Sequence, residues 1–500
     1  MTGDSEIYTY LRSVSCCRTC CLRYLKGRAD DFLNVDEGLK KREINLSTNE
    51  LPPENGDDGD NPPKRLRENV CVACLGLFES DLFGSLLDQV RSDDSEFKRY
   101  QCEGFTSSIF LPIVYHLRQL SLWIALVEQF PGRFEKEGPP PDVSVKDAFK
   151  MVLNRKLEEA LGKPFSVNGV AINVLFKYAK DDEEIRLLAK VKPGVFADRK
   201  TNKHCRKEFI TRNAFEKNFT PDSLDLDQYR KHIAVPPAIQ DEGVVLDKVS
   251  FTGPTVFLAG RYNKISRELS QTPWVIEGKR KMENSVQEIM TAVVAPYFGV
   301  PADSLIFSSS GREDVDVRCL GEGRPFVLEI PGSFKDFLEE SAAEEMEKAV
   351  DKSEQVSVKD LQLVDREELT HIKHGEENKR KFYRALCVLD GPVTLEVLKS
   401  LNIADPFVIE QWTPLRVLHR RPLLPRPRTI HSVKAFACRN NERAIVVDVV
   451  TQAGTYIKEL VHGDFGRTKP SLRSIIGQPI DIHALDVMAI DLDWPKRLRR

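Results

Sequence analysis

Charged residues gather in one short stretch, residues 311–318, with the sequence Gly-Arg-Glu-Asp-Val-Asp-Val-Arg. If this stretch is a strand, Asp314, Asp316 and Arg318 share one of its faces, because side chains alternate across a strand. Residues 321–330 are then expected to form a turn and a second strand, which makes a hairpin-like unit. Two carboxylates and a guanidinium at its mouth are suited to acid–base or electrostatic catalysis. An exposed Asp316–Arg318 ion pair would produce the same pattern.

Cysteines form two groups near the N-terminus. Residues 16–21 contain four cysteines, and Cys71 and Cys74 form a second group with CxxC spacing. The polar, low-complexity segment between the groups can have any length once a metal joins its ends. Two CxxC pairs arranged in this way indicate a four-thiolate zinc site. Four buried free thiols are the alternative.

Two further segments have the composition of RNA contacts. Tyr383 follows Lys379 and Lys381, so its ring could stack on a base while the lysines bind phosphates, although a tyrosine in an apolar strand is usually part of the core. Residues 414–431 are the most basic segment, and their prolines exclude a regular helix. We expect an extended arm that contacts phosphates, with a charged surface loop as the alternative. The arginines concerned are Arg420, Arg421, Arg426 and Arg428.

Composition describes a globular chain of two to four domains. It has 500 residues, of which 41% are hydrophobic and 30% charged, with a net charge of −3. The sequence shows neither an apolar run of membrane-spanning length nor a secretory signal, so we expect an intracellular protein without a membrane partner. Because the chain is not basic overall, nucleic-acid binding requires local clusters of positive charge.

Changes in composition divide the chain in two. Residues 1–245 mix helical and strand patterns and are expected to form an α/β accessory domain, with residues 29–69 as a flexible insertion because they lack apolar periodicity. Residues 250–500 contain most of the motifs and are expected to form a second domain. Within it, residues 335–378 are predicted to be a charged insertion.

The sequence Gly-Arg-Glu-Asp of residues 311–314 resembles the Gly-Arg-x-Asp signature of RNA pseudouridine synthases, whose aspartate is catalytic. Its continuation resembles one branch, the archaeal and eukaryotic tRNA pseudouridine synthase family with a cysteine-bearing, THUMP-containing N-terminal region. Residues 252–274 are similar to that family's entry into the catalytic domain. The segments Lys381-Phe-Tyr383 and Gly454-Thr-Tyr-Ile-Lys458 are similar to its second and third motifs.

This resemblance implies a role for particular residues. Asp314 would be the catalytic carboxylate, Tyr383 the active-site tyrosine, and Lys458 the basic residue that contacts and keeps ionised Asp314. In the first cysteine group the resemblance selects Cys17 and Cys20, which would ligate one structural zinc with Cys71 and Cys74. The remaining residues expected to contact substrate RNA are Arg261, Arg312, Lys379, Lys381, Tyr456, Leu460 and the four arginines of the arm.

The implied fold is α+β, with a mixed, mainly antiparallel sheet, flanking helices and a zinc-containing, THUMP-like α/β accessory domain. The implied activity is isomerisation of uridine to pseudouridine in the T arm of tRNA, at the adjacent positions that open the T loop, without a catalytic cofactor. We expect a monomer whose partner is tRNA and which resides in the nucleus, the cytoplasm or both.

Pseudouridine formation breaks the N1–C1′ bond, rotates the base and rejoins it through C5, which calls for an ionised carboxylate beside the ribose. Two routes meet this requirement: Asp314 attacks C1′, or it abstracts a sugar proton. One alternative function is a non-catalytic zinc-containing RNA-binding scaffold. Another is a hydrolase that uses Asp314 and Asp316 as acid and base, since alternate residues of a strand lie roughly 7 Å apart.

Overall fold

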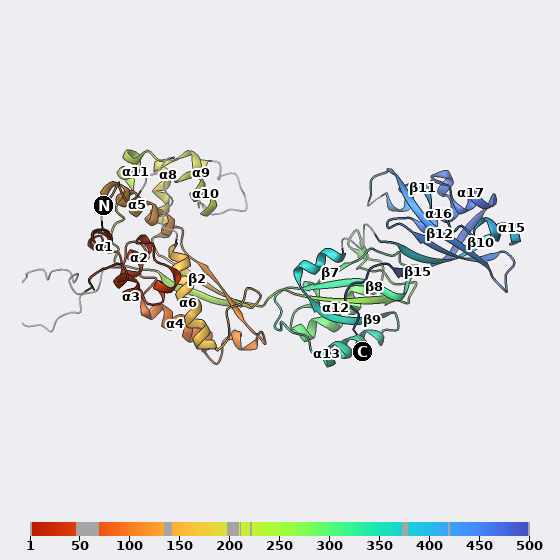
Figure 1. Cartoon of the computed structure of the whole chain (residues 1–500), viewed down its shortest axis with the longest axis horizontal. Coiled ribbons are helices and arrows are strands. Elements are labelled where there is room, and N and C mark those ends of the chain that lie inside the picture. The colour runs from red at the N-terminus through yellow and green to blue at the C-terminus, as the bar shows by residue number, and fades with distance from the viewer. Residues whose placement is uncertain are drawn as a thin grey trace, which may run out of the picture. The chain divides into compact units, whose positions relative to one another are not determined.

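The structure is a computed structural model that describes residues 3–46, 70–134, 143–197, 210, 212–220, 223–372, 379–418 and 421–498. The chain divides into two compact units, Met1–Thr252 and Gly253–Arg500 (Figure 1). Each has its own hydrophobic core, so each is described by itself. None of the described helices has both the length and the apolar character needed to cross a membrane.

The first unit surrounds a small sheet with helices. Its strands β1 Phe105–Phe110 and β2 Val170–Lys177 are parallel, and β3 Val245–Thr252 pairs antiparallel with β2. The described helices are α1 Asp4–Ser13, α2 Arg18–Tyr24, α3 Val35–Lys40, α4 Ser80–Arg91, α5 Val114–Gln129, α6 Val145–Leu161, α7 Asp181–Arg186, α8 Leu188–Val191, α9 Gly194–Ala197, α10 Arg212–Asn218 and α11 Leu226–His232. The THUMP-type assignment of this α/β unit stays a prediction.

The start of the predicted insertion is part of the fold. Residues Ala29–Phe32 form a 3-10 helix, α3 follows, and Phe32, Leu39 and Ile44 are buried in the core of the first unit. The prediction of a flexible segment was therefore wrong up to residue 46. The sequence pattern missed this structure because the apolar residues are too widely spaced to show a helical or strand period. Residues 47–69 lie outside the described residues.

A large mixed sheet forms the frame of the second unit. Its strand order is β14-β11-β12-β13-β10-β15-β8-β4-β9, and β7 pairs with β8. All neighbours are antiparallel except β8 and β15, which pair in parallel through Arg318 and Cys319. The strands are β4 Val256–Lys264, β7 Ile306–Ser309, β8 Arg318–Ile330, β9 Val356–Val364, β10 Lys381–Leu389, β11 Phe407–Trp412, β12 Pro425–Ala437, β13 Ala444–Thr451, β14 Thr468–Lys469 and β15 Ile480–Ile490, with β5 Val275–Ile276 and β6 Lys279–Arg280 paired separately.

Helices complete two cores on this sheet. One core joins α12 Val286–Phe298 and α13 Glu340–Asp351 to β4, β8 and β9. The other joins α15 Leu395–Ser400, α16 Ile457–His462 and α17 Leu472–Ile476 to the strands from β10 to β15. The short parallel β8–β15 pairing is the junction between the two parts of the sheet. The charged stretch 311–318 runs directly into that junction.

Three local expectations differ from the structure. Residues 313–317 are a loop, and β8 runs unbroken from Arg318 through Gly321 and Gly323, so no hairpin forms there. Both glycines have positive φ, which lets the strand kink without ending. The predicted charged insertion 335–378 contains α13 and β9, and β9 is an outer strand of the sheet. Its buried residues are interleaved with Glu and Lys, which masked its role in the core.

The predicted basic arm is also partly a strand. β12 begins at Pro425 and pairs with β11 from there, whereas its pairing with β13 begins only at Ile430. Pro425 and Pro427 therefore lie where β12 has one neighbour, and there the missing N–H is not needed by a second. The described residues of the segment contain no α-helix, as predicted, but they include a 3-10 turn at Leu415–Val417, and the prolines did not exclude the sheet.

Candidate active site and metal-binding cluster

The loop 311–317 is held through its backbone. Gln271 Nε2 donates to the Gly311 carbonyl at 3.0 Å, and Arg267 Nη1 donates to the Asp316 carbonyl at 2.9 Å. Between them, Lys264 Nζ donates to the carbonyls of Asp314 at 3.1 Å and Val315 at 2.6 Å. Because the carbonyls face inward, the side chains of the two aspartates are left to face outward.

A buried ion pair lies under this loop. Glu313 and Arg324 are almost fully buried, and their charged atoms are 2.8 Å apart. The Tyr262 hydroxyl donates to Glu313, and Gln271 donates in turn to Tyr262. Breaking a buried pair of this kind is strongly destabilising because the remaining charge has no solvent. Glu313 therefore anchors the chain next to Asp314.

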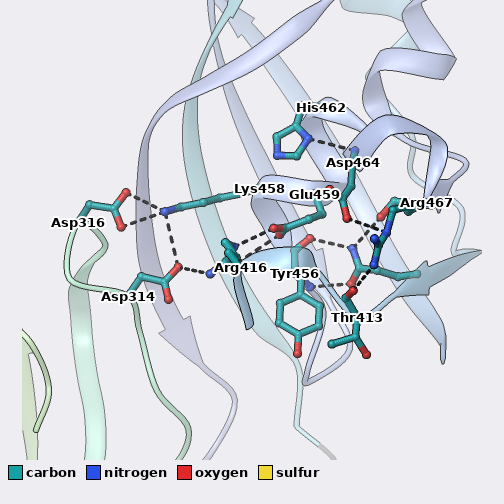
Figure 2. A network of polar contacts seen from close by, with 12 residues as sticks. Asp314, Asp316, Thr413, Arg416, Tyr456, Lys458, Glu459, His462, Asp464 and Arg467 are labelled. Carbon is teal, nitrogen blue, oxygen red and sulfur yellow. Dashed lines mark hydrogen bonds and ion pairs between the residues drawn. The ribbon is translucent and has the colours of Figure 1, made fainter. Parts of the chain in front are cut away.

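Two cations meet the carboxylate of Asp314 (Figure 2). Arg416 Nη1 donates to its Oδ2 at 2.8 Å, and Lys458 Nζ lies 3.5 Å from the same atom. Lys458 also binds both oxygens of Asp316, at 2.9 and 2.7 Å. The Asp314 side chain is 45% exposed, so it remains open to a ligand despite these contacts.

Helix α16 positions Lys458. Tyr456 is the residue before the helix, and Ile457, Leu460 and Val461 are buried in the core at helical spacing. The side chain of Lys458 therefore leaves the helix on another side, toward the aspartates. The next residue, Glu459, is only 4% exposed and accepts from Arg416 Nε at 2.8 Å and from its Nη2 at 3.3 Å.

Glu459 thus fixes the guanidinium that reaches Asp314. A bidentate carboxylate contact sets both the position and the plane of an arginine. Arg416 also lies over the ring of Tyr456, 5.9 Å from its centroid. Burial alone would lower the pKa of Arg416, but Glu459, and then Asp314, raise it above its ordinary value. The arginine stays charged beside Asp314.

The charges also shift the pKa of two neighbours. Burial alone would raise the pKa of Asp316, but its hydrogen bonds and attraction to Lys458 lower it below the ordinary value. Asp316 is therefore ionised at neutral pH and is not a proton donor. Burial lowers the pKa of Lys264 to about 8, against the attraction of Glu313 and Asp316.

Tyr383 and Lys381, on β10, lie close to the base of the loop. Burial raises the pKa of Tyr383 to about 12, opposed by the charge of Arg324, which places its hydroxyl near the buried pair. A Cβ added at Gly311 would come within 2.7 Å of Lys381 Nζ, and Gly311 has a φ of +89°. This position therefore requires glycine. Lys381 is buried, and its neighbour Lys379 is half-buried.

Two residues predicted to contact RNA have structural roles instead. Arg261 is 2% exposed and donates to the carbonyls of Glu322, Gly323 and two C-terminal residues, Leu492 and Trp494. It ties the chain's last described segment to β8, so the prediction that it binds RNA was wrong. Leu460 has no exposed surface and packs α16 onto the core.

The arginines of the basic segment have several intramolecular partners. Arg426 Nη1 donates to Thr413 Oγ1 at 3.2 Å, and Arg428 Nε donates to the Gly454 carbonyl at 3.2 Å. These two arginines therefore have contacts within the molecule. Burial, followed by repulsion from Arg426, lowers the pKa of Arg428. Arg421 is exposed, as is Arg312, whereas Arg420 lies outside the described residues.

Sequence analysis did not identify Arg416 or its partner Glu459. Arg416 lies inside the segment predicted as an arm, among several other arginines. What distinguishes it is a contact with residues more than forty and one hundred positions away, at Glu459 and Asp314. Glu459 could have been noticed as a carboxylate between the buried residues Ile457 and Leu460.

In the first unit the structure brings four cysteines together. The sulfur atoms of Cys17, Cys20, Cys71 and Cys74 all lie within 4.8 Å of one another, and those of Cys17 and Cys74 are 3.7 Å apart. Four sulfurs at about 2.3 Å from one zinc ion would be roughly 3.8 Å apart. The four thiols therefore fit a tetrahedral metal ion.

Donors around the cysteine cluster fit thiolates. The backbone N–H of Cys17 donates to Cys71 Sγ at 3.2 Å, and the N–H of Cys20 to Cys17 Sγ at 3.4 Å. Arg23, which is 1% exposed, donates to Cys20 Sγ. Such contacts orient ligands and offset their negative charge. Cys16 and Cys21 are buried but are not members of the group of four.

Comparisons with known proteins place the chain in a class, the pseudouridine synthases. The family described as Pus10, C-terminal, matches residues 257–491, and that described as Eukaryotic Pus10, N-terminal, matches residues 71–251. The chain belongs to the Pus10 family. The matches fall on the second and first units, respectively.

Relatives cover nearly the whole chain. A protein of Drosophila melanogaster is 47% identical over 496 residues, 98% of each chain. The human protein named tRNA pseudouridine synthase Pus10 is 35% identical over 446 residues, 88% of this chain and 82% of its own. The Archaeoglobus fulgidus protein of the same name is 38% identical over 247 residues, 47% of this chain and 67% of its own.

Proposed function

We propose that this protein is a tRNA pseudouridine synthase, an isomerase that converts uridine to pseudouridine with Asp314 as its catalytic carboxylate. The observation that carries the proposal is that two cations, Lys458 and Arg416, contact the half-exposed carboxylate of Asp314. The relatives' common name, tRNA pseudouridine synthase Pus10, supports tRNA as the substrate. The T arm, at the uridines that open the T loop, is the proposed target.

The geometry fits the chemistry of base rotation. The reaction needs a carboxylate beside C1′, and Asp314 presents one that contacts Arg416 and Lys458. Attack on C1′ and abstraction of a sugar proton both begin from that carboxylate, so either route uses the same two cations. Tyr383, beside the loop that carries Asp314, is the proposed stacking surface for the base that leaves the helix.

The alternative functions have less support. A hydrolase would need Asp316 or Asp314 to carry a proton, yet Lys458 lowers the pKa of Asp316 and holds it as an anion. A non-catalytic scaffold would have no use for a half-exposed aspartate held between Arg416 and Lys458. The four cysteines of the first unit serve either function, as ligands of one structural zinc ion that we include in the proposal.

Replacement of Asp314 tests the proposal. Unmodified tRNA transcripts should gain pseudouridine in the T arm with the wild-type protein and none with Asp314→Asn, because the amide cannot act as the carboxylate. Binding of tRNA should persist, since a carboxylate adds nothing to phosphate affinity. Asp303→Asn, at an exposed site of the same unit, is the matched control and should retain full activity.

Chemical mapping of pseudouridine on each transcript is the measurement. Modification by Asp314→Asn at the wild-type rate would exclude Asp314 as the catalytic residue. Absence of modification by the wild-type protein would exclude the function itself. Modification outside the T arm would leave the activity in place and correct the target.

A further inference from the structure

The loop that follows α16 presents an aromatic ring to solvent. Phe465 is 95% exposed, the largest fraction among the described large hydrophobic residues. It belongs to four consecutive residues with positive φ, from Gly463 to Gly466, in which Phe465 itself has a φ of +55°. A bulky residue in this left-handed region is strained and persists only where its surroundings enforce it.

Contacts within the loop enforce this conformation. Asp464 is 6% exposed, its N–H donates to His462 Nδ1 at 3.0 Å, and its carboxylate lies 3.4 Å from Arg467 Nε (Figure 2). The N–H groups of Gly466 and Thr468 both donate to the Gly463 carbonyl, at 2.9 and 3.2 Å. The polar contacts within the loop therefore stabilise a backbone conformation in which the ring of Phe465 is exposed to solvent.

The same contacts join the loop to the catalytic site. Arg467 Nη2 donates to the carbonyl of Thr413, three residues before Arg416. Gln411 donates both to the Tyr456 carbonyl at 2.9 Å and to Thr468 Oγ1 at 3.3 Å. Lys458, within α16, and Gly463, directly after it, are five residues apart, which is about 7.5 Å of helix rise. A strand of RNA that reaches Asp314 is therefore within reach of this loop.

An open groove of about 870 Å³ begins at Phe465 and is cationic. Lys469 and Arg473 line it and are exposed, and neither has an ion pair within the described residues. The groove has no acidic lining residue. Glu410, the strand partner of Lys469, forms no ion pair with it. Besides Phe465, the lining consists of seven residues with polar or charged side chains, three glycines and two prolines.

We propose that Phe465 is a stacking site for an unpaired nucleobase of the RNA substrate, with its neighbouring phosphates bound by Lys469 and Arg473. The inference rests on the proposed function for the identity of the RNA, and it adds a second contact site to it. An aromatic ring stacks on any base, and a basic groove tracks the backbone. Because hydrogen bonds within the loop already hold its backbone in this conformation, ordering it costs little on binding.

The test measures tRNA affinity and its salt dependence with the full-length chain. Phe465→Ala should weaken binding about 5- to 150-fold, the range for loss of one stacked base, and leave the salt slope unchanged. Phe465→Trp should restore affinity, because only an aromatic face is needed. Arg473→Gln should flatten the salt slope by about 0.7 instead. Phe436→Ala, another exposed aromatic of the same unit, is the control and should change neither quantity.

The rate at saturating protein should stay at the wild-type value in Phe465→Ala, since the ring touches no residue of the catalytic site. Wild-type tRNA affinity in Phe465→Ala would overturn the inference, and contact with a protein partner would then be the alternative role for the exposed ring. Failure of Phe465→Trp to restore binding would overturn it as well. Failure of this inference and failure of the proposed function are distinguishable. The first changes only the expected tRNA affinities of the variants, whereas in the second the wild-type protein forms no pseudouridine.

Discussion

At the scale of single residues, the site is defined by which charge is held by which partner. Asp314 is half-exposed and contacts two different cations, Arg416 and Lys458, whereas Asp316, which is more exposed, binds Lys458 through both of its oxygens. Arg416 is itself fixed by Glu459, a carboxylate with almost no exposure. We infer that Glu459 acts through Arg416 and is a positioning residue.

Replacing Arg416 separates its two roles. Arg416→Gln should slow the single-turnover rate by about 10²-fold, the effect of losing one preorganised charge. It should also reduce the free energy of unfolding by up to about 3 kcal/mol, because Glu459 keeps a buried charge without a partner. Urea unfolding and single-turnover kinetics are the measurements.

The double variant Arg416→Gln/Glu459→Gln provides the control. Two neutral amides can pair, so most of the lost stability should return, whereas the rate should not, since Asp314 still lacks its arginine. Recovery of the rate together with the stability would contradict a role for Arg416 in catalysis.

At the scale of elements, the loop 311–317 is held in place by side chains that donate hydrogen bonds to its backbone carbonyls. Lys264 is the central support, since it is fully buried and its Nζ donates to three carbonyls, those of Leu269, Asp314 and Val315. An ammonium has three N–H donors for these three acceptors, and a neutral amine has two. The position of Asp314 therefore depends on the protonation of Lys264.

Lys264 predicts an alkaline limit to activity. Burial lowers its pKa from the ordinary 10.5 to about 8, so it loses its proton as pH rises from 7 to 9. The single-turnover rate at saturating protein should fall over this range. The cause would not be unfolding, because between pH 8 and 10.5 the unfolded state binds more protons at Lys264, and this group's contribution to the free energy of unfolding rises with pH.

A pH profile of the rate beside one of thermal stability is the measurement. In Lys264→Arg the side chain stays charged throughout this pH range. The rate of the folded variant should therefore not fall between pH 7 and 9. A wild-type rate that is constant from pH 7 to 9.5 would show that the loop does not depend on this proton.

At the scale of the whole molecule, sequence reasoning identified short motifs and failed on long-range packing. The loop aspartate, Lys458 and the four cysteines lie in motifs with fixed local spacing, and the structure places Lys458 beside Asp314 and the cysteines in one group. Arg261 looked like a surface cation in a basic, aromatic segment. Its role depends on carbonyls sixty and more than two hundred residues away, which no local pattern encodes.

The two units also predict separate responses to loss of metal. The four cysteines are members of the first unit's core, and no described residue of that core belongs to the second unit. A metal ion bound by four thiolates contributes its binding free energy to folding of the unit that holds it. Cys71→Ser should therefore abolish zinc binding and destabilise the first unit alone.

Zinc analysis together with hydrogen exchange along the full chain provides the measurement. In Cys71→Ser, amides of β1, β2 and α5 should exchange faster, whereas those of β8, β10 and β13 should keep the protection they have in the wild type. Cys438→Ser, a half-buried cysteine of the second unit, is the control and should retain one zinc ion. A full zinc content in Cys71→Ser would exclude the site. Faster exchange in β8 and β10 as well would show that the two units fold as one. The substitution would then have destabilised the second unit, whose core contains none of the four cysteines.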